Sequence, residues 1–245
     1  GGTVGQIAAE KAAVIKPGSR VYTAVTDPEA FAGIDRAAVA CGAPLRVVGR
    51  DASFRVAGVW PGRLRLEVSG GSGAGLGLEV PLTGSFHASN VALAVMAAMD
   101  EGIGRGDIET GLSRIAASGY RARLEQVSAR PMVLLDVSHN PEGMERSCQA
   151  LREIRSAFRD LYVLIGVAAD KDAAGIVRPL GELARMVATV GLPTERSLSP
   201  EALGSLCRNA GVAEVQVCGS AVEGFDLLLS KAGPEDMILV TGSFF

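Results

Sequence analysis

The stretch Asp136-Val137-Ser138-His139-Asn140-Pro141 lies where a predicted buried strand ends and a predicted helix begins. The run before it, Pro131 to Leu135, is apolar and of strand length. Pro at position 141 suits the first turn of a helix, where its missing N–H would have no partner anyway. In an open parallel α/β sheet, ligands bind beyond the carboxyl ends of the strands. Asp136, His139 and Asn140 are therefore candidate site residues, although Asn140 could simply cap the helix and the other two could be solvated loop residues.

Strands and helices alternate strictly from this stretch to the end of the chain. The predicted strands are 132–135, 161–166, 186–190, 215–217 and 237–240, and the predicted helices are 141–158, 173–184, 200–210 and 221–230. This alternation predicts a doubly wound, mostly parallel, Rossmann-like domain of about five strands. Two further strand ends carry polar groups, at Asp170-Lys171-Asp172 and Thr241-Gly242-Ser243. We expect the three polar strand ends to gather at one edge of the sheet.

The first half of the chain is also α/β in character. Helices at 4–14 and 28–40 and strands at 20–25 and 45–48 predict a βαβ arrangement with parallel strands. Residues 54–82 alternate apolar with other side chains instead, which predicts an antiparallel flap. Its glycine-rich link from Gly70 to Gly77 is not followed by Gly-Lys-Ser/Thr, so we interpret it as a flexible connection and not as a phosphate-binding loop.

A polar, basic connector runs from Gly119 to Glu125. We place a domain boundary within it, which gives domains at 1–122 and 123–245.

Composition limits the possible partners. Of the 245 residues, 48% are hydrophobic and 21% charged, which is typical of a globular protein. The formal net charge is −3, so we expect neither nucleic acid nor a membrane as partner, and expect small molecules instead. Four dispersed cysteines and only two histidines argue against a zinc site, and we expect buried, cytosolic thiols. The sequence contains no signal peptide and no apolar run of spanning length, so we expect a cytoplasmic protein. It begins Gly1-Gly2-Thr3 without methionine, so we also expect it to be part of a longer protein.

Two further polar residues stand out in the first half. Lys11 follows Ile7 by four residues and is therefore on or near the apolar stripe of its helix. It could extend its amine to water or pair with Glu10. Asn90 precedes the predicted helix 91–99, where its amide could cap the helix or reach a ligand such as an adenine edge.

Taken together, the segments resemble folylpolyglutamate synthase and the bifunctional dihydrofolate synthase, which are members of the Mur ligase superfamily. The resemblance covers essentially the whole chain, and its motifs fall in the family's order. The matching segments are Thr3 to Gly18 with Glu10-Lys11-Ala12 and Lys16-Pro17-Gly18, Gly84 to Asn90, Arg123-Leu124-Glu125, Asp136 to Pro141, Gly166 with Asp170-Lys171-Asp172, Pro193 with Arg196, and Thr241-Gly242-Ser243.

The resemblance implies an ATP-dependent amide ligase built from part of a central ATPase domain followed by a glutamate ligase domain. In the family, the γ-phosphate of ATP is transferred to a folate or dihydropteroate carboxylate, and the amine of L-glutamate attacks the acyl phosphate. The cofactors would be ATP and Mg²⁺, whose charge offsets that of the transferring phosphoryl group. We expect a monomer that works in folate biosynthesis and one-carbon metabolism.

The resemblance also implies roles for single residues. Lys11 matches the lysine that family members carry as a carbamate, an anion that helps to hold magnesium. By this resemblance, Lys11 and His139 are the predicted catalytic residues.

Asn90 matches the family's adenine contact, Arg123 a phosphate contact and Asp136 a ribose contact. An arginine fork and a carboxylate acceptor suit these partners chemically. His139 and Ser243 match positions associated with the incoming glutamate, where they could fix its carboxylates.

The sequence departs from the family pattern at several positions. Phe86-His87 replace His-Gln, Ala13 replaces glycine, Arg121-Ala122 replace Pro-Gly, and Val137-Ser138 replace Gly-Ala. No Gly-Lys-Ser/Thr phosphate loop occurs anywhere. We therefore expect the 245-residue chain by itself to be unable to hydrolyse ATP.

Two alternatives remain open. One is a cell-wall Mur ligase, which shares the architecture but is not expected to combine the Glu10 to Gly18 segment with Ser138-His139-Asn140-Pro141. The other is a non-catalytic remnant or binding module, which Val137 and the missing phosphate loop would favour. The sequence also leaves open whether the parent protein makes dihydrofolate, extends polyglutamate tails, or does both.

Overall fold

The computed structural model describes residues 3–69 and 75–242. The chain forms two compact units. The N-terminal unit consists of Gly1–Ala57, Arg65–Glu79 and His87–Ser113, and the C-terminal unit consists of Gly58–Leu64, Val80–Phe86 and Arg114–Phe245. The domain boundary after residue 122 stays a prediction.

The N-terminal unit opens with the predicted βαβ arrangement. Its elements are α1 (Val4–Ala12), β1 (Val21–Thr23), α2 (Pro28–Ala40) and β2 (Leu45–Val47). β1 and β2 pair in parallel, with Val21 opposite Leu45. Asp27 caps α2, since its side chain accepts a hydrogen bond of 2.8 Å from the Ala30 N–H. The helix pair is close-packed, because a Cβ added at Gly33 of α2 would lie 3.7 Å from the Cβ of Ala8.

The predicted flap is a separate three-stranded sheet with the order β3-β4-β5. Its strands are β3 (Ser53–Trp60), β4 (Arg63–Ser69) and β5 (Leu76–Val80), and alternate residues of β4 and β5 are buried, as the period-two pattern predicts. Most of the glycine-rich link lies outside the described residues. The helices α3 (Ala88–Asp100) and α4 (Arg105–Ser113) complete this part of the chain.

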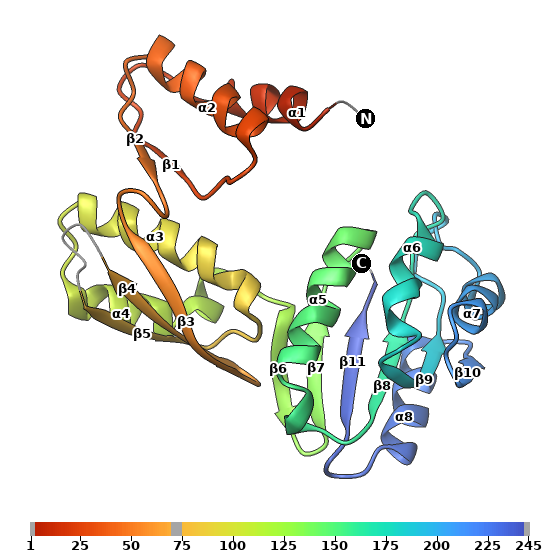
Figure 1. Ribbon diagram of the computed structural model, residues 1–245. Helices are drawn as coiled ribbons and strands as arrows, with labels where there is room; N and C mark the ends of the chain where they lie inside the picture. Colours follow the sequence, from red (N-terminus) through yellow and green to blue (C-terminus); the bar gives the residue numbers. More distant parts are fainter. Residues whose placement is uncertain (1–2, 70–74, 243–245) are drawn as a thin grey trace. The chain divides into compact units, whose positions relative to one another are not determined.

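The C-terminal unit contains a six-stranded sheet with the order β10-β9-β8-β11-β7-β6 (Figure 1). Its strands are β6 (Arg123–Ala129), β7 (Met132–Asp136), β8 (Leu161–Ile165), β9 (Ala184–Thr189), β10 (Glu214–Val217) and β11 (Met237–Thr241). All neighbouring pairs are parallel except β6 with β7. The predicted doubly wound, mostly parallel domain is thus confirmed, with one more strand than expected.

The additional strand, β6, corrects the sequence-based interpretation of Gly119 to Glu125 as a connector only. β6 is an edge strand whose residues are mostly polar, and of its seven residues only Leu124 is buried. A strand with so little apolar character lacks the period-two signal that reveals half-buried strands. It forms because β7 offers its backbone groups for antiparallel pairing.

Helices cover both faces of this sheet: α5 (Pro141–Glu153), α6 (Ala173–Val177), α7 (Pro200–Asn209) and α8 (Ala221–Lys231). One core cluster joins Leu134 and Leu239 to α5, α6 and α7, and a second joins Val133 and Ile238 to α8. Figure 1 shows α5 and α6 on one face and α8 on the other. Successive residues of a strand therefore point to opposite faces of the sheet and pack into different cores.

Two helices end five or more residues before their predicted ends. α6 was predicted to reach residue 184 but ends at Val177, followed by a 3-10 turn at Arg178–Leu180. Pro179 explains the difference, since it has no N–H to donate and restricts the residue before it. α5 likewise ends at Glu153 and continues as a 3-10 turn at Arg155–Ala157, short of the predicted end at residue 158.

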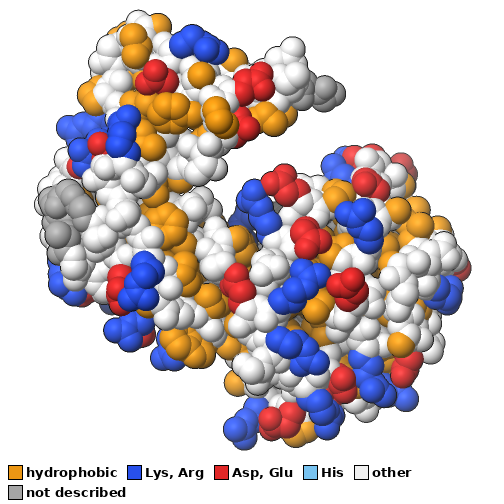
Figure 2. All heavy atoms as spheres, in the orientation of Figure 1, with side chains coloured by type: hydrophobic (Ala, Val, Ile, Leu, Met, Phe, Trp, Pro, Cys, Tyr) orange, Lys and Arg blue, Asp and Glu red, His pale blue; other side chains and the backbone are white. Residues whose placement is uncertain are grey.

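The structure also bears on the cysteines and on membranes. All four cysteines are free thiols; three are buried as expected, but Cys41 is partly exposed. Within residues 3–69 and 75–242, no helix has the length and apolar character needed to cross a membrane. Basic and acidic side chains are interspersed over the face seen in Figure 2.

Candidate functional site

The turn from β7 to α5 has a defined conformation. Asn140 is the N-cap of α5, and its Oδ1 accepts a hydrogen bond of 2.7 Å from the Gly143 N–H. Pro141 occupies the first turn, as predicted. Asn140 thus does have the capping role, and the cap fixes the backbone that carries Asp136 and His139.

Asp136 is the buried carboxylate at the end of β7, with 6% of its surface exposed. Its Oδ2 accepts hydrogen bonds from the Ser147 hydroxyl at 2.8 Å and from the Ser138 N–H at 3.2 Å. The two serine hydroxyls lie 2.9 Å apart, so Asp136, Ser138 and Ser147 form one network, the Asp136 cluster. Burial raises the pKa of the adjoining Cys148 thiol to about 12, which keeps it neutral beside this carboxylate.

His139 is exposed, and one of its ring nitrogens is engaged by the turn. Its Nδ1 lies 2.9 Å from the carbonyl oxygen of Val137. A carbonyl can only accept, so Nδ1 carries the proton and Nε2 carries the lone pair of the neutral ring. The turn therefore selects a tautomer in which Nε2 can take up a proton.

Arg123 lies beside Asp136 through strand pairing. In the antiparallel pair of β6 and β7, Arg123 is the register partner of Asp136. The two residues flanking Arg123, Ala122 and Leu124, both have φ of 52°, and the register shifts between Arg123 and Glu125. Left-handed backbone at two non-glycine residues is strained, and such bulges redirect a side chain at a site. The Arg123 guanidinium lies 5.4 Å from the centre of the Tyr120 ring.

The end of β11 adds a hydroxyl to the same edge. Val240 is paired with Leu135, so one position further along the register Thr241 lies beside Asp136 on the face that α5 covers. Thr241 is 6% exposed, and within the described part of the chain its Oγ1 has no hydrogen-bond partner. Gly242 has φ of 111°, and a Cβ there would come 2.2 Å from the Gly166 carbonyl oxygen, so only glycine fits. Ser243 lies outside the described residues.

The loops after β8 and β9 are tied together. Arg196 donates a hydrogen bond of 2.6 Å to Asp170, whose carboxylate also lies 3.4 Å from the Lys171 amine. The Ala169 N–H donates to the Arg196 carbonyl at 2.7 Å. Partial desolvation raises the pKa of the exposed Asp170, but hydrogen bonds from Arg196 and Lys171 lower it more, so the pKa lies below its ordinary value. The predicted gathering of polar strand ends is thus found for β7, β8 and β11, which are neighbours in the sheet.

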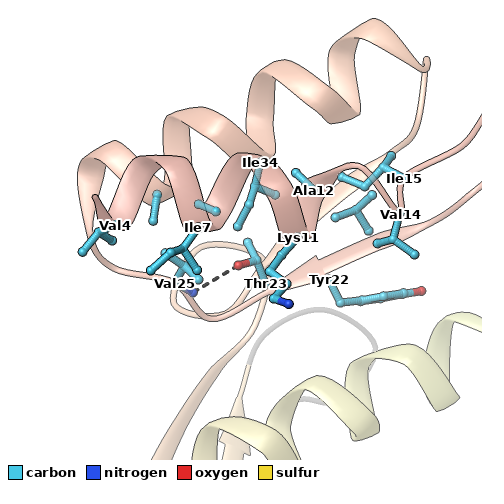
Figure 3. Close-up of a pocket in the computed structure, with 13 residues that line it drawn as sticks. Val4, Ile7, Lys11, Ala12, Val14, Ile15, Tyr22, Thr23, Val25 and Ile34 are labelled. Carbon is cyan, nitrogen blue, oxygen red and sulfur yellow. Dashed lines mark hydrogen bonds between the residues drawn. The ribbon is translucent and has the colours of Figure 1, made fainter. Parts of the chain in front are cut away.

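Lys11 belongs to the N-terminal unit. Its side chain is 78% exposed, and its amine lies 3.9 Å from a Glu10 carboxylate oxygen, which is one of the two arrangements considered from the sequence. It borders a hollow of about 360 Å³ between α1, β1 and α2. Figure 3 shows Lys11 on the same side of α1 as Ile7, with its amine end toward Tyr22. The apolar stripe near Lys11 is itself exposed, since Ile7 is 49% and Val14 is 77% accessible.

These surroundings do not provide a metal site by themselves. Across residues 3–69 and 75–242, no group of three or more His, Cys, Asp or Glu side chains could hold a metal ion. The hollow beside Lys11 is lined mainly by alkyl groups such as Ile7, Ile15 and Val25, which do not bind magnesium. The carbamate at Lys11 stays a prediction.

Asn90 does not have the predicted capping position. It is the third residue of α3, whose N-cap is His87, and its side chain is exposed. The helix begins earlier than predicted because Ala88 and Ser89 continue the 3-10 turn at Ser85–His87 directly into α3. Arg123, Asp136 and His139 are thus near one another in the C-terminal unit, whereas Lys11 and Asn90 belong to the N-terminal unit.

Ser147 is the residue that sequence reasoning missed. The positions 144, 147, 148 and 151 form the buried stripe of α5, and Ser147 is the polar member of that stripe, 2% exposed. The sequence does contain a signal for Ser147: it is a polar residue on the apolar stripe of the helix that directly follows the candidate carboxylate Asp136.

The chain is similar to known ligases in sequence. The family model described as Mur ligase, glutamate ligase domain, matches residues 122–244. The folylpolyglutamate synthase of Lacticaseibacillus casei is 30% identical over 251 residues, covering 100% of this chain and 56% of that protein. The UDP-N-acetylmuramoyl-L-alanyl-D-glutamate–2,6-diaminopimelate ligase of Pseudomonas aeruginosa is 30% identical over 178 residues, covering 69% of this chain and 35% of that protein.

Solved structures agree with the fold. The folylpolyglutamate synthase of Thermotoga maritima has a TM-score of 0.83 at 23% identity, covering 98% of this chain and 55% of that chain. E. coli FolC in complex with ADP has a TM-score of 0.80 at 25% identity, covering 98% of this chain and 54% of that chain. The chain thus spans about half the length of the whole-length relatives that it matches.

Proposed function

Because this chain belongs to the Mur ligase family through its glutamate ligase domain, we propose that it supplies the glutamate-ligating part of an ATP-dependent amide ligase. The similarity to a folylpolyglutamate synthase extends over 100% of this chain. The first domain, residues 1–122, would then be part of the ATPase domain, and residues 123–245 would be the glutamate ligase domain.

The proposed reaction has two steps. A carboxylate of folate or dihydropteroate attacks the γ-phosphorus of ATP, which forms an acyl phosphate and releases ADP. The amine of L-glutamate then attacks the acyl carbon, and the C–O bond to phosphate breaks as the amide bond forms. The chain's own part in this scheme is to bind the nucleotide and the amino acid and to handle the proton of the amine.

The strongest support is the pairing of Arg123 with Asp136 at the carboxyl edge of the sheet. A guanidinium suits phosphate oxygens, and a buried, fixed carboxylate suits the hydroxyls of a ribose. The relative crystallised with ADP has the same fold at a TM-score of 0.80. We therefore assign Arg123 to a phosphate and Asp136 to the ribose.

His139 is assigned to the incoming glutamate. The ammonium group of glutamate must lose a proton before it can attack, and the lone pair on Nε2 of neutral His139 can accept it. Once protonated, the same nitrogen donates to a carboxylate. Lys11 as a carbamate on magnesium, Asn90 on adenine and Ser243 on glutamate follow from the family resemblance.

The test is a ligation assay on the full-length product of the gene that encodes residues 1–245. We expect ADP release that requires both L-glutamate and a folate or dihydropteroate acceptor. His139→Ala should lower kcat/KM for glutamate by about 100-fold, the scale of a lost general base. Asn209→Ala, at the far end of α7, is the matched control and should leave the rate unchanged. Release of ADP without dependence on glutamate would contradict the proposal.

A cell-wall ligase is the second candidate, favoured by the 30% identity to the diaminopimelate ligase over 69% of this chain. The same assay separates the two. Ligation of 2,6-diaminopimelate to a UDP-linked muramoyl peptide, with no activity on L-glutamate and folate, would establish the alternative. Failure of both substrate pairs would favour the non-catalytic module.

A further inference from the structure

Ser147 stands out because it is a hydroxyl among fully buried apolar groups. Its neighbours on the same stripe of α5, Met144, Cys148 and Leu151, are each 0% exposed. A buried hydroxyl is unfavourable unless it forms hydrogen bonds. Ser147 forms two, to Asp136 Oδ2 at 2.8 Å and to Ser138 Oγ at 2.9 Å.

The geometry of these bonds fixes the carboxylate of Asp136. The Ser147 hydroxyl and the Ser138 N–H both donate to the same oxygen of Asp136, Oδ2. One donor comes from α5 and the other from the turn after β7, so the carboxylate is held from two elements. A carboxylate restrained in this way loses little rotational freedom when its other oxygen accepts a hydrogen bond from a ligand.

Ser138 completes the arrangement from the turn. Its hydroxyl engages the Ser147 hydroxyl, while its backbone engages Asp136 directly. A Cβ added at Gly143 would lie 3.3 Å from Ser138 Oγ, so the first turn of α5 closely borders the network. The N-terminal turn of α5 therefore borders the Asp136 cluster on the Ser138 side.

We propose that Ser147 is a positioning residue that holds Asp136 for a hydrogen bond from a ribose hydroxyl of the nucleotide. The proposal rests on the proposed function, in which Asp136 contacts the ribose. Ser147 itself does not contact the nucleotide; it acts through the carboxylate.

This role predicts a pattern that a purely structural role does not produce. Loss of the Ser147 hydroxyl should weaken the binding of only those nucleotides that have ribose hydroxyls. A general loosening of α5 would weaken the binding of nucleotides with and without these hydroxyls to the same extent. The ratio of the two affinities therefore isolates the positioning effect.

The experiment measures dissociation constants for ATP and for 2′,3′-dideoxy-ATP by calorimetry, on the full-length product of the gene. We expect the wild type to prefer ATP by about tenfold or more, the scale of a hydrogen bond to a charged group. Ser147→Ala should reduce this preference to about threefold or less and leave dideoxy-ATP binding unchanged within about twofold. Ser205→Ala is the matched control, because Ser205 is a helical serine whose hydroxyl donates to the Glu201 carbonyl of its own helix.

The outcomes separate the two levels of the proposal. If Ser147→Ala weakens both nucleotides equally, Ser147 is structural and the inference is overturned. If Asp136→Asn removes the preference but Ser147→Ala retains it, the inference fails while the ribose assignment stands. If the wild type shows no preference, or binds no nucleotide, the proposed function fails first. Ser147→Cys keeps the volume and loses most of the donor strength, so it gives the same readout if the alanine variant does not fold.

Discussion

Asp236 illustrates how a single buried carboxylate can hold this sheet together. It is 0% exposed and accepts hydrogen bonds from the Gly233 N–H at 2.7 Å and from two guanidinium nitrogens of Arg159 at 2.9 and 3.1 Å. The Asp160 N–H donates to it at 3.2 Å, so the segments that precede β8 and β11 are joined at this residue. Burial raises the pKa of Asp236, but the Gly233 N–H and Arg159 lower it more, and the net shift is downward.

The lowered pKa predicts a pH-dependent stability. A carboxyl whose folded pKa lies below its unfolded value, about 3.9, contributes stability that is fully present above that value and is lost as the pH falls through the folded pKa. Asp236→Asn should cost about 1–3 kcal/mol of unfolding free energy at pH 7, and the difference from wild type should shrink below about pH 4. Urea unfolding at pH 7 and pH 3 measures both. A difference that is the same at the two pH values would contradict this account.

At the scale of the secondary-structure elements, one glycine allows the segment after α6 to approach the end of α7 closely. Gly181 follows the 3-10 turn after α6, and a Cβ there would lie 1.8 Å from the Ala210 carbonyl oxygen at the end of α7. Backbone cannot move aside as a flexible side chain would. This contact therefore sets how closely the two helices approach one another on their face of the sheet.

Gly181→Ala should destabilise the protein by about 3 kcal/mol or more, because overpacking displaces backbone. Gly111→Ala is the matched control: Gly111 lies within α4, and nothing lies within 4 Å of a Cβ placed there. That substitution should be neutral or should stabilise by up to about 1 kcal/mol, the gain in helix propensity. Thermal unfolding measures the change in stability of each variant relative to the wild type. Equal effects would show that the Ala210 contact is not limiting.

At the scale of the whole molecule, the sequence contains the residues of the proposed nucleotide site but no phosphate loop. The chain matches about half of the folylpolyglutamate synthase of L. casei and contains no Gly-Lys-Ser/Thr segment. Arg123 and Asp136 are the proposed contacts of a phosphate and the ribose, but these 245 residues contain no Gly-Lys-Ser/Thr loop whose backbone N–H groups would cradle the β- and γ-phosphates.

We therefore predict that the purified 245-residue chain does not turn over ATP. Phosphate release, followed with and without L-glutamate and a folate acceptor, should equal that of buffer alone. Arg123→Ala in the same chain serves as a control for contaminating ATPases, whose activity it would leave unchanged. Turnover that is lost in the Arg123 variant would contradict the prediction.

Local signals determined much of what the structure contains. Apolar runs, helical periodicity and the possible cap at Asn140 identified the parallel α/β fold and the β7–α5 turn, because each depends on neighbours within a few residues. The edge strand β6 was missed, since Arg123 to Ala129 is mostly polar and forms only against β7. The capping role of Asn90 was wrong because a preceding 3-10 turn merges with α3.

The sequence by itself thus determined the class of fold, the strand ends that carry polar groups and the candidate residues Arg123, Asp136 and His139. Only the tertiary structure decided that β11 lies between β8 and β7, which brings Thr241 beside Asp136, and that Ser147 reaches the same carboxylate from α5. The physical reason is that strand order and helix packing depend on contacts between residues far apart in the chain, whereas periodicity and capping depend on residues a few positions apart.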